Sequence, residues 1–292
     1  MRAETLPSDF IRRSQGRRRA FNLGMCILIG LAAAVAVVPL FSVFIYVFSQ
    51  GASAVNLSFF TELPKPVGES GGGMANALVG TLILISIASL IGIPWGIMTG
   101  TWLSEYGRGR FGGAIRFAID LLASTPSIIL GLFVYALVVM PMKRFSALAG
   151  GFALAVLMVP TIARSTEELL KLVPVHIREA GLALGLPRWK VIFSIVLRGS
   201  RGAIATGVVL ALARAAGETA PLLFTSFNNQ FWNRGLGQPI ASLSVQIYTY
   251  AISPYDDWHR QAWAGALVLV LLVLVVNIIT RILLSPATGR AK

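Results

Sequence analysis

Charged residues are scarce in this chain of 292 residues. Asp, Glu, Lys and Arg together make up 13% of it, about half the share found in a soluble domain. Acidic residues are fewer than basic residues, 12 against 25, and the net charge is +13. So little charge excludes an ordinary soluble enzyme, while the positive excess suits nucleic acid, an anionic membrane surface or an anionic substrate. The positions of the charges must distinguish among these three.

The chain also lacks the cysteines for a disulfide and a recognisable set of ligands for a metal ion. The chain has one cysteine, Cys26, and two histidines, His176 and His259, and none of them stands in a CxxC or HExxH spacing. A disulfide needs two cysteines, and a structural zinc site needs four grouped ligands. We therefore expect no disulfide, no metal site and no catalytic residues, since the apolar segments contain no grouping of nucleophile and base.

Long apolar runs take the place of charge. The segments without any charged residue are 20–61, 70–104, 121–142, 145–163 and 261–280. About 20 apolar helical residues cross a hydrocarbon core of about 30 Å, so each segment allows one membrane-spanning helix. We place these helices at 23–48, 76–102, 121–140, 145–163 and 263–283. One more helix, the fifth in chain order, lies at 202–224 and is apolar except for Arg214 and Glu218. The sequence thus predicts an all-α integral membrane domain of six transmembrane helices, because a helix satisfies its backbone hydrogen bonds internally.

The distribution of basic residues predicts the orientation of these helices. Six basic residues precede Phe21 and seven lie between Arg164 and Arg201, whereas the connections on the opposite side of the predicted bundle hold five. Basic residues are enriched in cytoplasmic segments, so we expect both termini in the cytoplasm. Topology then explains most of the positive charge, and we expect no nucleic-acid partner.

A basic tail precedes the first predicted helix. Arg17, Arg18 and Arg19 resemble the start of a secretory or twin-arginine signal, but the apolar run that follows is too long and lacks a convincing cleavage site. We therefore expect residues 1–22 to form a mobile cytoplasmic tail on anionic lipid. Residues 23–48 are then a retained transmembrane helix.

Glycine recurs at every fourth position in the second predicted helix. These residues are Gly92, Gly96 and Gly100, and their spacing is typical of helices that approach one another closely in lipid. We interpret the repeat as a packing surface. A hinge in the middle of the helix is the alternative.

The fifth predicted helix has a similar stripe of small residues. Its members are Ala203, Gly207, Ala211 and Ala215. A rotation of about 100° per residue places Arg214 and Glu218 on or beside this stripe, whereas Val208, Val209 and Leu212 point away from it. We therefore expect one side of the helix to face protein or water and the other to face lipid.

Arg214 and Glu218 are the charges in this fifth apolar span. A charge at membrane depth costs about 3 kcal/mol or more unless it is paired or hydrated, so we expect both side chains to face the protein interior. Their i, i+4 spacing allows an ion pair. The pair either ties the helix to a neighbour or lines a path for an anionic solute, with Glu218 holding Arg214 in place.

The connection 164–201 is the longest predicted cytoplasmic segment. A short amphipathic helix follows Pro174 and ends at Gly185, and Pro187 is typical of the first turn of a second helix that continues toward the fifth span. Such a pair of helices either lies on the membrane surface or docks a cytoplasmic partner.

This connection resembles the coupling loop of permeases in ATP-binding-cassette (ABC) importers, which has the pattern E-A-A, three residues, G, nine residues, I-x-L-P. The matching residues are Glu179, Ala180, Gly185, Ile195 and Leu197. Gly181 replaces the second alanine and Arg198 the proline. Glycine lowers helix propensity by about 1 kcal/mol relative to alanine, so we expect a less rigid coupling helix. The resemblance implies that the loop, Gly181 included, seats in a groove of a separate ATPase and transmits its closure.

The resemblance is narrower in the last third of the chain. Residues 214–225 read R-A-A-G-E-T-A-P-L-L-F-T, followed by N-Q-F-W at 229–232 and W-A-G at 263–265. From about residue 76 onward the chain is similar to the PstA family, one of two permease families of the bacterial high-affinity phosphate importer. The sibling PstC family usually has methionine where Ala220 stands. The resemblance implies that Arg214 belongs to the phosphate path, together with Glu218. It implies a path role for Arg164 too, although a basic flank at the inner end of the fourth helix explains Arg164 equally well.

The same resemblance implies a fold and an assembly. Residues 76–283 would form a type I ABC importer permease domain in the bacterial cytoplasmic membrane. Its partners would be a homologous PstC-like permease, a dimer of PstB-like ATPase subunits and an extracytoplasmic PstS-like phosphate-binding protein docking on 226–237 and 246–259. The chain has no G-x-x-x-x-G-K-[ST] loop, so we expect no cofactor here, with ATP and Mg²⁺ in the ATPase. The alternative is a self-sufficient secondary anion carrier, in which Arg214 and Glu218 couple ion movement directly.

Overall fold

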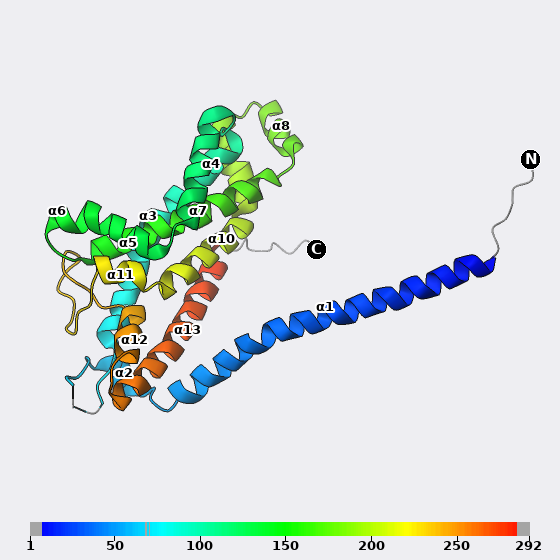
Figure 1. Ribbon diagram of the computed structural model, residues 1–292. Coiled ribbons are helices and arrows are strands. Elements are labelled where there is room, and N and C mark those ends of the chain that lie inside the picture. Colours follow the sequence, from blue (N-terminus) through cyan, green and yellow to red (C-terminus); the bar gives the residue numbers. More distant parts are fainter. Residues whose placement is uncertain (1–7, 68, 70, 285–292) are drawn as a thin grey trace, which may run out of the picture. The chain divides into compact units, whose positions relative to one another are not determined.

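The computed structural model describes residues 8–67, 69 and 71–284, and every regular element in these residues is helical (Figure 1). The elements are α1 (Ser8–Gly51), α2 (Leu57–Thr61), α3 (Ala75–Glu105), α4 (Gly109–Ser124), α5 (Ser127–Val134), η1 (Tyr135–Val139), α6 (Met140–Met142), α7 (Ala147–Lys171), α8 (Val175–Ala183), α9 (Arg188–Val191), η2 (Ile192–Leu197), α10 (Arg198–Gly217), α11 (Ala220–Thr225), α12 (Leu243–Ala251) and α13 (Asp256–Leu284). The two η segments have the wider π-helical turn. In the described part of the chain, five helices are long and apolar enough to span a membrane, and a bent pair adds a sixth. The prediction of an all-helical membrane protein is confirmed.

Helix α1 belongs, as far as Ser49, to a unit separate from the rest of the chain. It begins at Ser8, so the helix is longer than the predicted 23–48, and the expected tail is helical from that residue on. Residues 8–22 contain no proline and several good helix formers, which accounts for the extension. Residues 1–7 of the predicted tail lie outside the described residues.

The glycine repeat packs α3 against α7. A Cβ atom added at Gly96 would lie 2.7 Å from Ile162 Cβ, and one at Gly92 would lie 3.2 Å from Met158 Cβ. A Cβ at Gly100 would collide with the Ala163 carbonyl oxygen. Helix backbones can approach this closely only where one side has no side chain, so the structure supports packing over a hinge.

Substituting Gly100 by alanine is expected to destabilise the chain by roughly 1–3 kcal/mol, the usual effect of overpacking a close contact. The new methyl group would also lie 2.7 Å from Thr166 Cβ, so α3 and α7 must separate. Gly113→Ala in α4 is the control, because no atom lies within 4 Å of its added Cβ and alanine favours the helix. Thermal unfolding in detergent should show a lower midpoint for the first variant alone. Equal midpoints would contradict the packing role.

The third predicted span, 121–140, is wrong as a single straight helix. Helix α4 begins at Gly109, and its axis is bent by 106° from the helical run that starts at Ser127. Thr125, at the corner, is extended with φ −71° and ψ 132°. It precedes Pro126, and proline disfavours the helical conformation in the residue before it. The apolar run continues across a corner that the proline creates.

The fifth predicted span, 202–224, is wrong at both ends. The helix is continuous from Arg188 to Gly217, and the short α11 follows after Glu218, whose backbone is extended. Pro221 explains the break: in a continuous helix its ring would clash with the Gly217 carbonyl, and it has no N–H to bond to that oxygen.

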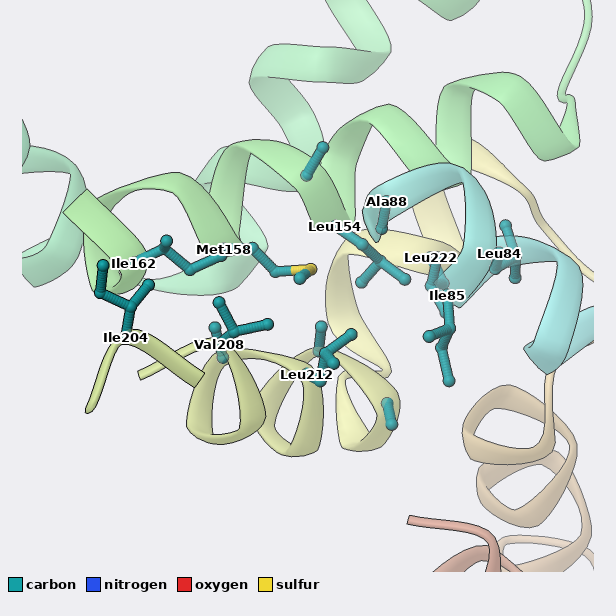
Figure 2. Close-up of a cluster of buried hydrophobic side chains, with 14 of the residues drawn as sticks. Leu84, Ile85, Ala88, Leu154, Met158, Ile162, Ile204, Val208, Leu212 and Leu222 are labelled. Atoms are coloured by element: carbon teal, nitrogen blue, oxygen red, sulfur yellow. The ribbon is translucent and has the colours of Figure 1, made fainter. Parts of the chain in front are cut away.

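The lipid-facing prediction for this span is also wrong for two of its residues. Val208 and Leu212 are fully or almost fully buried, and Figure 2 shows them directed toward Met158 of α7 and the surrounding apolar cluster. This cluster joins α3, α7, α10 and α11 into one core. Because the small residues Gly207, Ala211 and Ala215 are buried as well, the packed face of α10 is broader than the predicted stripe.

The remaining spans agree with prediction in their central residues and differ at their ends. Helix α3 begins one residue before 76 and ends three after 102. Helix α7 runs to Lys171 rather than to residue 163, and α13 begins at Asp256 rather than at 263. Charged residues limit an apolar run in the sequence, but they do not end a helix that projects beyond the hydrocarbon core.

Candidate functional site

Arg214 lies in the last turn of α10, at the break before α11. Its Nε is 3.6 Å from Glu218 Oε1, and the side chains are 47% and 17% exposed. At this distance the groups form an ion pair without a good hydrogen bond. A cation at a helix C-terminus is also stabilised by the helix dipole. In the part of the chain that the structure describes, Glu218 is the one acidic partner of Arg214, so most guanidinium donors remain available for an anion.

The exposed side of α10 includes Arg214. Ala203, Thr206, Leu210 and Gly217 are exposed at the same helical spacing. The expectation that Arg214 faces the interior is therefore wrong for the single chain, in which it lies on an uncovered face. A charge at membrane depth needs water or another protein beside it, so this face suits a water-filled path or a contact with a second subunit.

The backbone holds Glu218 in position. Ser244 of α12 donates a hydrogen bond of 2.9 Å to the Glu218 carbonyl oxygen, and the Glu218 N–H donates to the Ala215 carbonyl. The helix break is thus fixed from two sides. Its i, i+4 pairing with Arg214 was predicted from the sequence, although the two residues are not on one continuous helix.

Arg164 has a different environment. It lies within α7, and its guanidinium donates to Glu168 Oε1 at 2.8 Å and to Asp120 Oδ1 of α4 at 3.0 Å. All three side chains are about half exposed. Two carboxylates already neutralise this arginine, so the contacts favour a link between α4 and α7 over an anion site. Its predicted path role stays a prediction.

The segment predicted as a coupling loop has the expected helix, turn and helix. Gly185 has φ +77°, the left-handed conformation that favours glycine after a helix. The Leu186 N–H donates to the Gly181 carbonyl, and the Gly185 N–H donates to the Leu182 carbonyl. This is the Schellman arrangement. Pro187 is the N-cap of α9, one residue before the first turn in which it was expected.

The residues that match the coupling-loop pattern of ABC importer permeases form an exposed group and a packed group. Glu179, Ala180 and Gly185 are exposed, whereas Ile195 and Leu197 pack against the core. Gly181 is buried, and a Cβ there would lie 2.9 Å from Val191 Cγ2 and 3.0 Å from Ile195 Cδ1. The glycine therefore permits close packing of α8 against α9 and η2, which gives it a structural reason beyond its low helix propensity.

A groove of about 420 Å³ borders α8. Its lining residues are Ser104, Glu105, Arg108, Lys171, Val173, Val175, Arg178, Glu179, Leu182, Arg188, Val191 and Ile192. Of the six charged side chains, Arg178 and Glu105 bind each other and are 19% and 6% exposed, whereas Arg108, Lys171, Glu179 and Arg188 are exposed. Glu179 is therefore the exposed acidic group beside a basic groove, a chemistry suited to a protein partner.

Two arginines that bind near the end of α3 were not among the residues predicted from the sequence. Arg178 pairs with Glu105 at 2.6 Å, and Arg116 of α4 pairs with the buried Glu167 at 2.7 Å. Arg116 also donates to the Leu103 and Gly107 carbonyls. Cations that bond the last carbonyls of a helix favour its C-terminus. The only sequence signal was the charge at the ends of the apolar runs, because the partners are distant in the chain.

Comparison with known proteins identifies relatives over almost the whole chain. The family model described as "Binding-protein-dependent transport system inner membrane component" matches residues 92–285. The "Phosphate transport system permease protein PstA" of Yersinia pestis is 46% identical over 98% of this chain and 97% of its own length. The "Probable phosphate transport system permease protein PstA" of Methanocaldococcus jannaschii is 34% identical over 85% and 88%.

Solved structures show the same fold. A bacterial ABC transporter involved in the import of the acidic polysaccharide alginate has a chain that aligns with a TM-score of 0.66 at 14% identity, over 95% of this chain and 100% of that one. An inward-facing form of the MetNI methionine ABC transporter aligns with a TM-score of 0.58 at 18% identity, over 74% and 95%. At these identities the likeness concerns the architecture alone.

Proposed function

This chain belongs to the PstA family of phosphate transport permeases, within the binding-protein-dependent inner membrane components, and from that premise we propose how its residues act. It is the permease subunit of an ATP-driven phosphate importer and a multi-pass protein of the cytoplasmic membrane.

Arg214 is the phosphate-binding group of the path. The observation that carries this assignment is its loose pairing, 3.6 Å from Glu218, on an uncovered face of α10. A guanidinium holds two phosphate oxygens at once. Glu218 reduces the net charge without occupying the donors, so the site attracts phosphate but does not retain it. Weak binding is what a path requires, because the ion must leave.

The uncovered surfaces support a set of proposed partners. A homologous PstC-like permease covers the exposed side of α10 and closes the path around Arg214. A dimer of PstB-like ATPase subunits, which supplies ATP and Mg²⁺, receives the exposed α8 residues around Glu179. An extracytoplasmic PstS-like protein docks on the segment after α11, where Phe231 and Trp232 are exposed. This chain needs no cofactor for these roles.

The transport cycle is alternating access. Closure of the ATPase dimer on ATP displaces α8 and opens the path to the loaded binding protein, and ATP hydrolysis returns it to the cytoplasmic side. Arg214 then exchanges phosphate between the two openings. In this scheme the chain supplies no chemical step, only binding and movement.

Reconstitution of the complex in liposomes tests this function. We expect uptake of labelled phosphate that requires ATP and the binding protein, with sulfate at equal concentration giving much less uptake. The chain reconstituted alone is the control, since a secondary carrier would move phosphate without the ATPase. Uptake by the chain alone, or equal uptake of sulfate, would overturn the proposal.

A further inference from the structure

We propose that Arg178 is the positioning residue that makes the coupling helix α8 move together with α3 and α7, through a buried ion pair with Glu105. The inference rests on the proposed function, because it assigns the route by which ATPase movement reaches the transmembrane helices. Arg178 precedes Glu179, the predicted docking residue. One residue of α8 therefore contacts the ATPase, and its neighbour holds the permease.

The geometry of the Arg178 and Glu105 pair is that of a rigid link. Arg178 Nη2 and Nε lie 2.6 Å and 2.9 Å from Glu105 Oε1, and Nε lies 3.2 Å from Oε2. The side chains are 19% and 6% exposed. A planar guanidinium that makes several bonds to one carboxylate fixes direction as well as distance. Movement of α8 is thus transmitted to the last turn of α3.

Arg178 also binds the end of α7. Its Nη1 donates to the Val173 carbonyl at 2.7 Å, and its Nη2 donates to the Leu170 carbonyl at 2.9 Å. Leu170 lies in the last turn of α7, and Val173 follows that helix. The guanidinium therefore joins three helices, α8, α3 and α7, and its donors are used inside this chain rather than by a partner.

The packing of α8 gives this link its importance. Helix α8 packs mainly on α9 and η2, where the buried Gly181 meets Val191 and Ile195. The Arg178 side chain connects α8 directly to the end of α3. Arg188 of α9 supports the same turn, since it donates to the Glu105 carbonyl at 2.8 Å and its guanidinium carbon lies 4.6 Å from the centre of the Tyr106 ring.

The position of Glu105 indicates a role beyond stability. A carboxylate in the last turn of a helix opposes the helix dipole, and a buried ion pair is often no more stabilising than apolar residues of similar size. Glu105 is both buried and at the C-terminal end of α3. Its arrangement is explained by the need for a directional connection that apolar packing does not give.

The test uses the complete complex, with both permeases, the ATPase and the binding protein, in liposomes. The variants are Arg178→Gln, Glu105→Gln, Arg178→Lys and the double variant Glu105→Gln with Arg178→Gln. In the double variant neither side chain is charged, so no unpaired buried charge opposes folding. Lys190→Gln in α9 is the control, because Lys190 is exposed and has no part in the link. Phosphate uptake and ATP hydrolysis are measured on the same samples.

We expect the variants to assemble with the ATPase and to keep basal hydrolysis. Phosphate transported per ATP should fall by about tenfold or more in both glutamine variants and in the double variant, and by less in Arg178→Lys, which keeps the charge but loses the fork. Lys190→Gln should match the original complex. A merely structural role would reduce the amount of complex but not this ratio.

A second readout separates this inference from the assignment of phosphate. Thr206 lies on the side of α10 that carries Arg214 and borders the proposed path. In the assembled complex, the rate of thiol labelling of a cysteine placed there, with Cys26 replaced by alanine, reports how the path opens. ATP should change that rate in the original complex and leave it unchanged in the double variant. If phosphate does not stimulate ATP hydrolysis by the complex, the assignment of phosphate as the substrate is overturned, but the Arg178 link is not. An assembled double variant with the original transport ratio, or with the original ATP-dependent labelling, overturns the link.

Discussion

Replacing Arg214 with glutamine is expected to lower phosphate uptake by about a hundredfold or more, while the chain still inserts and assembles. Glutamine keeps a polar side chain at this position, but it lacks the positive charge of arginine and the guanidinium group that donates two parallel hydrogen bonds. A hydrogen bond to a charged group contributes about 1.5–3 kcal/mol, and two such bonds to phosphate correspond to a factor of a hundred or more at about 1.4 kcal/mol per tenfold. Initial rates of labelled phosphate uptake, normalised to the amount of assembled complex, measure the effect.

Two matched variants give this result its meaning. Arg201→Gln removes another exposed basic residue of α10, and we expect little change. Arg164→Gln removes an arginine already neutralised by Asp120 and Glu168, so its effect should be much smaller than that of Arg214→Gln. Full phosphate uptake by Arg214→Gln would contradict the assignment of Arg214 to the phosphate path. Equal losses at Arg164 and Arg214 would show that both arginines contribute.

The long helices could be predicted because they depend on simple counting. Residues 76–102 were expected to span the membrane from an uncharged apolar run, and α3 (Ala75–Glu105) includes them all. The same argument was wrong for residues 121–140, because hydropathy shows that a run is apolar but not whether its helix is straight. The bend of 106° arises at Thr125 and Pro126, a local backbone restriction inside an otherwise uninterrupted apolar stretch.

The candidate site was predictable where its partners are close in sequence. The spacing of Arg214 and Glu218 indicated their pairing, and Gly185 marked the end of the coupling helix. The pair of Arg178 and Glu105 could not be predicted in this way, since the two residues are 73 positions apart in the chain. Only the packing of α8, α9 and η2 beside the end of α3 brings them together.

Charge reversal at Glu179 is expected to remove ATPase association and, with it, ATP-dependent uptake, without preventing insertion. Glu179 is exposed on α8 and borders a groove whose other charged residues include Arg108, Lys171 and Arg188. Lysine at this position would make the exposed face uniformly basic. An ATPase surface that accepts a carboxylate would then meet a like charge, which weakens association further than neutral glutamine does.

Co-purification of the ATPase with tagged permease measures this effect, in parallel with phosphate uptake. We expect at least a tenfold loss of bound ATPase for Glu179→Lys and a smaller loss for Glu179→Gln. Glu62→Lys is the control, because Glu62 is exposed outside the coupling loop and its reversal adds the same charge. Normal ATPase binding by Glu179→Lys would refute the docking role. Normal binding together with lost uptake would place the defect after docking, at the step that Arg178 transmits to α3.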